Sequence, residues 1–99
     1  MAKPIPASGA GAVRLILKNK EDFHFDLRKK EMDGKKESYL YDVFYVNATG
    51  TLNIALEENE IKIAALNLGL GKVITLSNDE NLKKLCRYVL EKSWEFLYV

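Results

Sequence analysis

The sequence predicts an α+β domain in which an antiparallel meander of five to seven strands, as a twisted sheet or a partly open barrel, packs against one C-terminal α-helix. Two observations indicate this fold class. Apolar and polar residues alternate with a period of two from Val13 to Leu76, and short turn signals interrupt the alternation. After Ser77 the apolar residues recur every three or four positions, as in an amphipathic helix. Consecutive hairpins followed by a helix make the meander the simplest topology.

The first twelve residues, MAKPIPASGAGA, carry prolines and small residues but no periodic pattern. We expect residues 1–12 to form a flexible N-terminal arm and residues 13–99 to form the single domain. No apolar run here has the length of a signal-peptide core, and none elsewhere reaches the length of a membrane span. We therefore expect the protein to lie in the cytoplasm or another intracellular compartment, without contact to a membrane.

Six segments have the alternation of strands: residues 13–18, 22–28, 38–46, 51–57, 60–68 and 72–76. The first two form a predicted hairpin with one solvent-facing side. Residues 29–37, KKEMDGKKE, contain the turn dipeptide Asp33-Gly34 in a highly charged stretch. They are either a mobile loop or the exposed tip of an extended hairpin.

The segment 38–46 differs from the others because both of its faces are largely apolar, with a row of tyrosines on one of them. Such a strand is either covered on both sides or exposes one row for another purpose. Exposed rings on a sheet can anchor a protein partner or stack on nucleic-acid bases. The candidate contact residues are Tyr39, Tyr41 and Tyr45.

A helix is predicted over residues 78–95, because Ser77 and Glu80 have the spacing of a capping box and an apolar stripe follows. Near its end, Trp94, Phe96 and Tyr98 crowd together. These aromatic side chains either lock the helix to the sheet or form the seam of a homodimer.

The passage from Lys72 to Ser77, followed by an amphipathic helix, resembles the end of single-stranded nucleic-acid-binding modules of the PUR and PC4 type. An antiparallel barrel-like sheet closed by a C-terminal helix is also similar to the pleckstrin-homology architecture. Both resemblances concern the fold, and neither by itself implies a ligand.

The charge balance excludes a strong global field, because 15 basic residues face 14 acidic ones and the net charge is +1. The local concentration of Lys29, Lys30, Lys35 and Lys36 is interrupted by acidic residues. It is either a solvated loop or a basic rim that steers phosphate groups.

The chain is poorly supplied for catalysis, since it has one histidine and one cysteine. Cys86 falls on the apolar stripe of the predicted helix, where a small apolar residue packs. His24 shares a strand face with Asp22 and Asp26, but same-face neighbours on a strand lie roughly 6 to 7 Å apart, which is too far for easy chelation. We predict no enzymatic activity, no metal site and no cofactor.

Near-neutral charge, the lack of catalytic groups and the surplus of aromatic residues favour a non-enzymatic protein-binding module. It would act as an accessory or regulatory subunit that occupies the surface of a partner. The alternative is a single-stranded nucleic-acid-binding module that uses the tyrosine row for stacking and the four lysines for steering.

Overall fold

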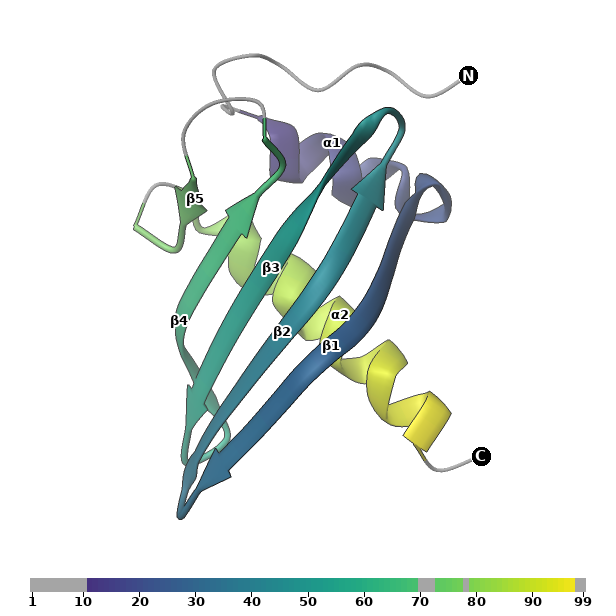
Figure 1. Cartoon of the computed structure of the whole chain (residues 1–99). Coiled ribbons are helices and arrows are strands. Elements are labelled where there is room, and N and C mark those ends of the chain that lie inside the picture. Colours follow the sequence, from purple (N-terminus) through teal and green to yellow (C-terminus); the bar gives the residue numbers. More distant parts are fainter. Residues whose placement is uncertain (1–10, 70–72, 78, 98–99) are drawn as a thin grey trace.

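The computed structural model describes residues 11–69, 73–77 and 79–97, with the side chains up to Ser93. The elements are helix α1 (Ala12–Lys18), a short 3-10 turn η1 (Lys20–Asp22), the strands β1 (Phe23–Asp33), β2 (Lys36–Tyr45), β3 (Ala48–Glu57), β4 (Glu60–Asn67) and β5 (Ile74–Thr75), and helix α2 (Asn81–Leu97). The strands lie side by side in chain order in one antiparallel sheet (Figure 1). The predicted fold class is therefore confirmed, with five strands and one C-terminal helix on the sheet.

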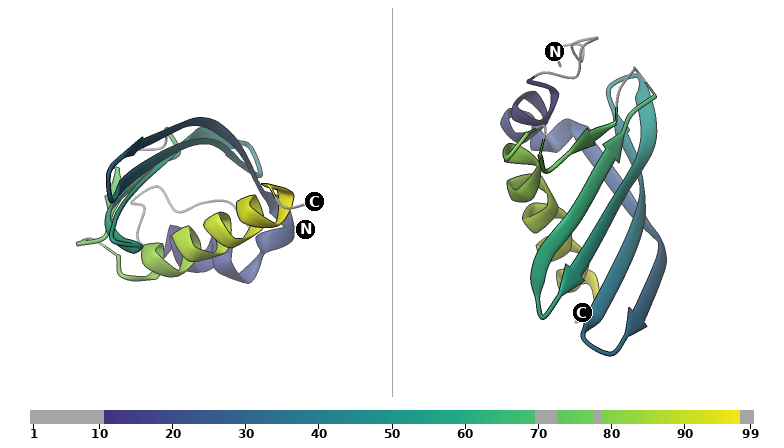
Figure 2. Two further views of the ribbon diagram at one scale, coloured as in Figure 1. Left: turned by 90° about the horizontal axis from the view of Figure 1, so that it is seen from below. Right: turned by 90° about the vertical axis from the view of Figure 1, so that its left-hand side faces the viewer.

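The sheet is strongly curved (Figure 2). It is also open, because β1 and β5 each have a neighbouring strand on one side only. Figure 2 shows that α2 runs across its concave side and that α1 lies at one end of the same side, so that the two helices close the half-barrel. No described helix lies over the opposite, convex side. None of the described helices has both the length and the apolar character that crossing a bilayer requires.

The core lies between the concave face and the two helices. Its most completely buried side chains come from every layer: Val13 and Ile16 of α1, Tyr41, Val43 and Tyr45 of β2, Leu52 and Ile54 of β3, Leu66 of β4, and Leu82, Leu85, Cys86 and Val89 of α2. The prediction that residues 38–46 form a strand covered on both sides is wrong. The tyrosine row of β2 faces the core, whereas Phe44 in the opposite row is 43% exposed.

The predicted strand over residues 13–18 is wrong, since this segment is helix α1, which also takes Ala12 from the predicted arm. Val13, Leu15 and Leu17 alternate as in a strand, but Val13 and Ile16 also lie one helical turn apart. The helix buries Ala12, Val13 and Ile16 together against α2 and the sheet, whereas a strand would have turned Ile16 to solvent. The rest of the predicted arm, residues 1–10, lies outside the described residues.

The charged segment 29–37 is the tip of an extended hairpin and not a loop. This is one of the two structures predicted for it. β1 continues to Asp33 and β2 begins at Lys36, with Gly34 at φ +63° in the turn. The tip contacts the neighbouring β3–β4 turn, where the backbone N–H of Glu58 donates to the carbonyl oxygen of Lys35 at 3.1 Å. The two hairpin ends therefore support each other.

The predicted capping box at Ser77 is also wrong. The backbone N–H of Asn81 donates to the Asp79 carboxylate at 2.9 Å, so the cap lies two residues later and α2 begins at Asn81 rather than at residue 78. The Ser77 hydroxyl is instead hydrogen-bonded to the hydroxyl of Thr75, at 3.0 Å. Asp is as good an N-cap as Ser, and two candidates in one short stretch cannot be ranked by spacing alone.

Candidate functional site

The three tyrosines predicted as a contact surface lie beneath α2. Tyr39, Tyr41 and Tyr45 are 3%, 0% and 0% exposed. The row points to the concave side of the sheet, so α2 and α1 cover it and the three rings are not an exposed contact surface. Burial raises the pKa of Tyr41 above its ordinary value, partly opposed by a hydrogen bond with Ser93. These rings are therefore part of the core and not part of an outer surface.

The tyrosines are held by specific contacts as well as by burial. The Ser93 hydroxyl of α2 donates to the Tyr41 hydroxyl at 2.9 Å, and the Tyr39 hydroxyl donates to the Glu37 carboxylate at 2.9 Å. The Tyr39 and Tyr41 rings are stacked at 6.4 Å, and Phe25 meets Tyr41 edge-on at 5.9 Å. A base could not enter this stack without displacing α2.

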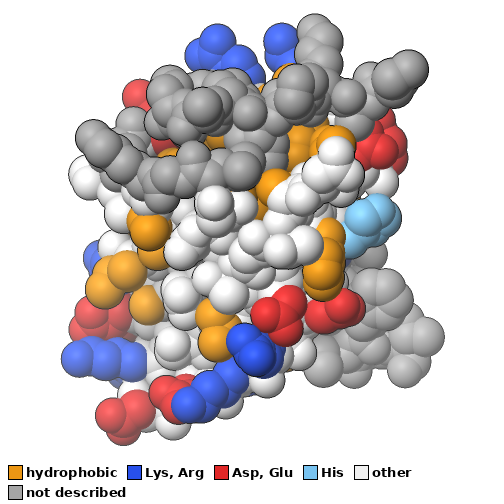
Figure 3. Space-filling view, turned by 45° about the horizontal axis from the view of Figure 1, so that its top comes forward, with side chains coloured by type: hydrophobic (Ala, Val, Ile, Leu, Met, Phe, Trp, Pro, Cys, Tyr) orange, Lys and Arg blue, Asp and Glu red, His pale blue; other side chains and the backbone are white. Residues whose placement is uncertain are grey.

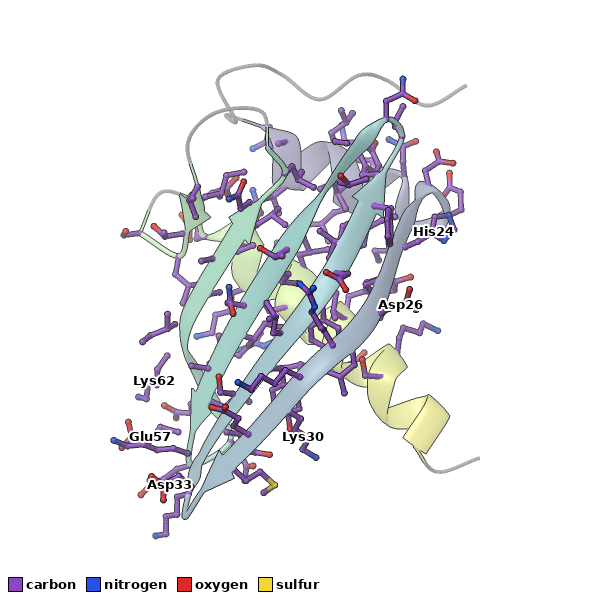
Figure 4. The ribbon with its side chains drawn as sticks, in the orientation of Figure 1. His24, Asp26, Lys30, Asp33, Glu57 and Lys62 are labelled. Atoms are coloured by element: carbon purple, nitrogen blue, oxygen red, sulfur yellow. The ribbon has the colours of Figure 1, made fainter. Side chains whose placement is uncertain are left out.

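The four lysines at the end of the β1–β2 hairpin do not share one surface. Lys30 turns to the concave side, with its ammonium 5.6 Å from the Tyr39 ring (Figure 4). Lys29 forms an ion pair with Glu31 at 2.9 Å, and Lys35 with Glu58 at 3.7 Å. In the strand register, Lys36 lies between two acidic residues, Asp33 and Glu57. Because acidic side chains lie beside these lysines, the four positive charges do not form one continuous basic patch.

His24 and Asp26 lie on the outer side of β1 (Figure 4). Asp26 stands directly opposite Asp42 of β2, a like-charge pair that destabilises a sheet unless it is compensated. A bulge between Leu27 and Lys29 brings Arg28 within 3.5 Å of the Asp42 carboxylate, which supplies that compensation. Within the described residues, no group of three or more histidine, cysteine or acidic side chains could hold a metal ion.

Cys86 lies in the core and is completely buried. Burial raises the pKa of its thiol to about 12, so the reactive thiolate is absent at neutral pH. This environment does not activate the thiol as a nucleophile.

The convex side of the sheet carries a patch that the sequence analysis did not single out. The strand register places six outward-facing side chains in two adjacent rows across β2, β3 and β4, and none of the six is charged. We call this patch the neutral strip: Ser38, Leu40, Asn53, Ala55, Ile63 and Ala65. Ile63 is 64% exposed. Figure 3 shows that charged side chains are absent from the middle of this face and gather towards its lower end.

A hollow of about 300 Å³ lies where the neutral strip approaches the hairpin ends. Ser38, Ala55 and Ile63 contribute to its lining, and charged side chains surround them, among them Glu57 and Lys62. The hollow exists because small side chains meet long ones there. It offers a partner both an apolar contact and polar groups that fix its orientation.

A signal for the neutral strip was present in the sequence. Ala55 stands in the same row as the polar residues Thr51, Asn53 and Glu57, where charged or long polar residues are more usual. Single small residues in such rows have no meaning until the register aligns them across strands. Periodicity along one strand cannot supply this alignment.

No protein-family model, no curated protein and no solved structure matches this chain.

Proposed function

We propose that this protein is a non-enzymatic protein-binding module, an accessory or regulatory subunit whose contact surface is the convex side of the sheet. The observation that carries the proposal is the neutral strip, six adjacent uncharged side chains on three strands with charged residues around them. No described segment of the chain covers it. An uncharged centre with a charged rim is the usual anatomy of a protein contact surface.

The geometry of the strip suits a protein partner. Small side chains such as Ala55 and Ala65 let a partner approach the sheet closely, and Leu40 and Ile63 add apolar area. The charged residues at the hairpin ends can fix the orientation of the partner and exclude wrong ones.

A protein partner is favoured over single-stranded nucleic acid by the position of the aromatic rings. Binding of single strands depends on rings that stack on bases and on a basic groove along the backbone. Tyr39, Tyr41 and Tyr45 are buried, and acidic residues divide the lysines at the hairpin end. The convex side offers no comparable row, since Phe44 is the only phenylalanine, tyrosine or tryptophan among its outward rows within the described strands.

The test is capture of a partner by the tagged protein from a lysate of its source cells, compared between variants. Ala55→Arg places a long charged side chain in the middle of the neutral strip without entering the core. We expect this variant to lose at least about tenfold in affinity for the captured protein, the effect of disrupting an interface centre. Asn47→Arg adds the same side chain to the exposed β2–β3 turn and should retain the partner.

Both variants should keep the melting temperature of the wild type within a few degrees. The proposal is wrong if Ala55→Arg retains the partner as well as Asn47→Arg does. The proposal is also wrong if every protein captured by the wild type is captured by the Ala55→Arg variant as well.

A further inference from the structure

A second hollow, of about 280 Å³, lies on the other side of β4, between α2 and the β3–β4 hairpin. Leu56, Ile61 and Leu90 form its apolar part, and Lys83, Arg87 and Glu91 of α2 contribute charged groups. We call it the α2–β4 groove. It is separate from the neutral strip, because Ile61 and Leu56 belong to the concave rows of their strands whereas Ile63 belongs to the convex row.

The charged side chains that line this groove differ in whether they have an ion-pair partner. Lys83 and Arg87 are four residues apart, so their side chains lie on the same side of α2. Neither forms an ion pair with any residue that the structure describes. Glu60, the acidic residue of the strand wall, already holds the Lys62 ammonium at 3.0 Å. The hydrogen bond and charge of Lys62, with a smaller effect of Lys83, hold the pKa of Glu60 below its ordinary value.

The helix wall therefore presents two unpaired cations beside an apolar surface. Glu91, one turn beyond Arg87, is the remaining carboxylate of the lining and limits where a second negative charge can be placed. A guanidinium group binds a carboxylate through two parallel hydrogen bonds, which makes Arg87 the stronger anchor of the two.

The size of the groove indicates what kind of ligand it takes. Sites for small molecules usually have about 300 to 1,000 Å³ and enclose most of the ligand. A volume of about 280 Å³ in a groove open to solvent accommodates one or two side chains instead. An amino-acid side chain presented by a peptide fits this volume better than a whole cofactor does.

We propose that the α2–β4 groove binds an acidic peptide segment of a partner protein. An apolar side chain of the segment packs against Leu56, Ile61 and Leu90, and an adjacent aspartate or glutamate pairs with Arg87 and Lys83. This site is additional to the convex contact surface and does not depend on it.

The test begins with a phage-displayed library of random dodecapeptides, selected on the immobilised full-length protein at low ionic strength. We expect the selected peptides to share an aspartate or glutamate next to a leucine, isoleucine or phenylalanine. A synthetic fluorescent peptide of the selected sequence then gives the Kd by anisotropy. Arg87→Glu and Lys83→Glu should each raise this Kd by about tenfold or more, since each replaces a favourable charge by a repulsive one.

The matched control is Lys84→Glu, the same charge change on the next residue of α2, which is exposed but does not line the groove. It should change the Kd by no more than about twofold, the effect of screened long-range charge. Ala55→Arg should leave peptide binding unchanged, so that failure of this proposal and failure of the convex surface are distinguished.

Three results would overturn the proposal. The selection yields no shared acidic and apolar pattern, or the peptide binds Arg87→Glu as tightly as the wild type, or Lys84→Glu weakens binding as much as Lys83→Glu does. A labelled oligothymidine strand serves as the second probe. The basic side of α2 binds nucleic acid instead if the oligothymidine displaces the peptide and if Lys83→Glu and Lys84→Glu weaken oligothymidine binding equally.

Discussion

At the residue scale, the absence of one side chain decides how closely two segments approach. Gly50 of β3 lies against the end of β4. A Cβ on Gly50 would overlap the carbonyl oxygen of Asn67 and lie 2.7 Å from its carbonyl carbon and 2.9 Å from the Cα of Leu68. All three atoms are backbone, so no side-chain rotation relieves the clash.

Gly50→Ala should therefore lower the free energy of unfolding by about 3 kcal/mol, at the upper end of ordinary point mutations. The control is Gly34→Ala, at φ +63° but with no atom within 4 Å of the new Cβ. Only backbone strain acts there, at a cost of about 1 kcal/mol. Urea denaturation of both variants measures the difference, and equal losses would contradict the close contact at Gly50.

At the scale of elements, the placement of α2 on the sheet depends on apolar burial with one polar contact that specifies position. The hydrogen bond from Ser93 to Tyr41 joins residues 52 positions apart, between the C-terminal half of α2 and strand β2. Apolar packing is non-directional, whereas a hydrogen bond has a defined geometry. The Ser93–Tyr41 bond therefore fixes where α2 lies along the tyrosine row.

Tyr41→Phe and Ser93→Ala should each cost about 1 kcal/mol of unfolding free energy, the usual net value of such a bond. After one substitution has removed the hydrogen bond, the second cannot remove it again. The double variant should therefore lose less unfolding free energy than the two single variants added together, with a coupling energy of about 1 kcal/mol. A double-mutant cycle by urea denaturation measures this. Strictly additive losses would show that α2 does not depend on this contact.

At the scale of the whole molecule, the core contains titratable groups that stay neutral over the ordinary pH range. Burial raises the pKa of Cys86 to about 12 and also raises the pKa values of Tyr41 and Tyr45. In the unfolded chain the thiol ionises near about pH 8.5 and the phenols near about pH 10. Between those values and the native ones the unfolded state binds fewer protons, so stability falls as the pH rises.

The melting temperature should therefore be insensitive to these groups below about pH 8 and should fall steadily from about pH 9 upwards. Each group contributes a slope of up to about 1.4 kcal/mol per pH unit. Cys86→Ala should be less stable at neutral pH but should lose less between pH 9 and pH 11. Thermal denaturation across this range measures the slopes, and parallel curves for the two proteins would refute a buried neutral thiol.

How much of this could be predicted from the sequence depends on how much of each feature is local. The strands β1 to β4 follow from alternation, because a pleated strand with one buried face imposes a period of two on its residues. The segment of α1 is short enough to satisfy both periods, and only Ile16, buried in the helix, separates them. The tyrosines form an unusual row that the sequence makes visible, but the sequence leaves open whether this row is covered or exposed.

The sequence by itself determined the α+β class, the chain order of β1 to β4 and most of the side chains that share a face, because these follow from local periodicity and short turns. It did not record the irregularity that places Ile61 and Ile63 on opposite faces of β4. Only the tertiary structure decided which face α2 covers, that Tyr39, Tyr41 and Tyr45 lie beneath it, and that small uncharged side chains from β2, β3 and β4 form the neutral strip. The physical reason is that register and layer packing join residues distant in the chain, and no local pattern records which of two apolar faces the helix will bury.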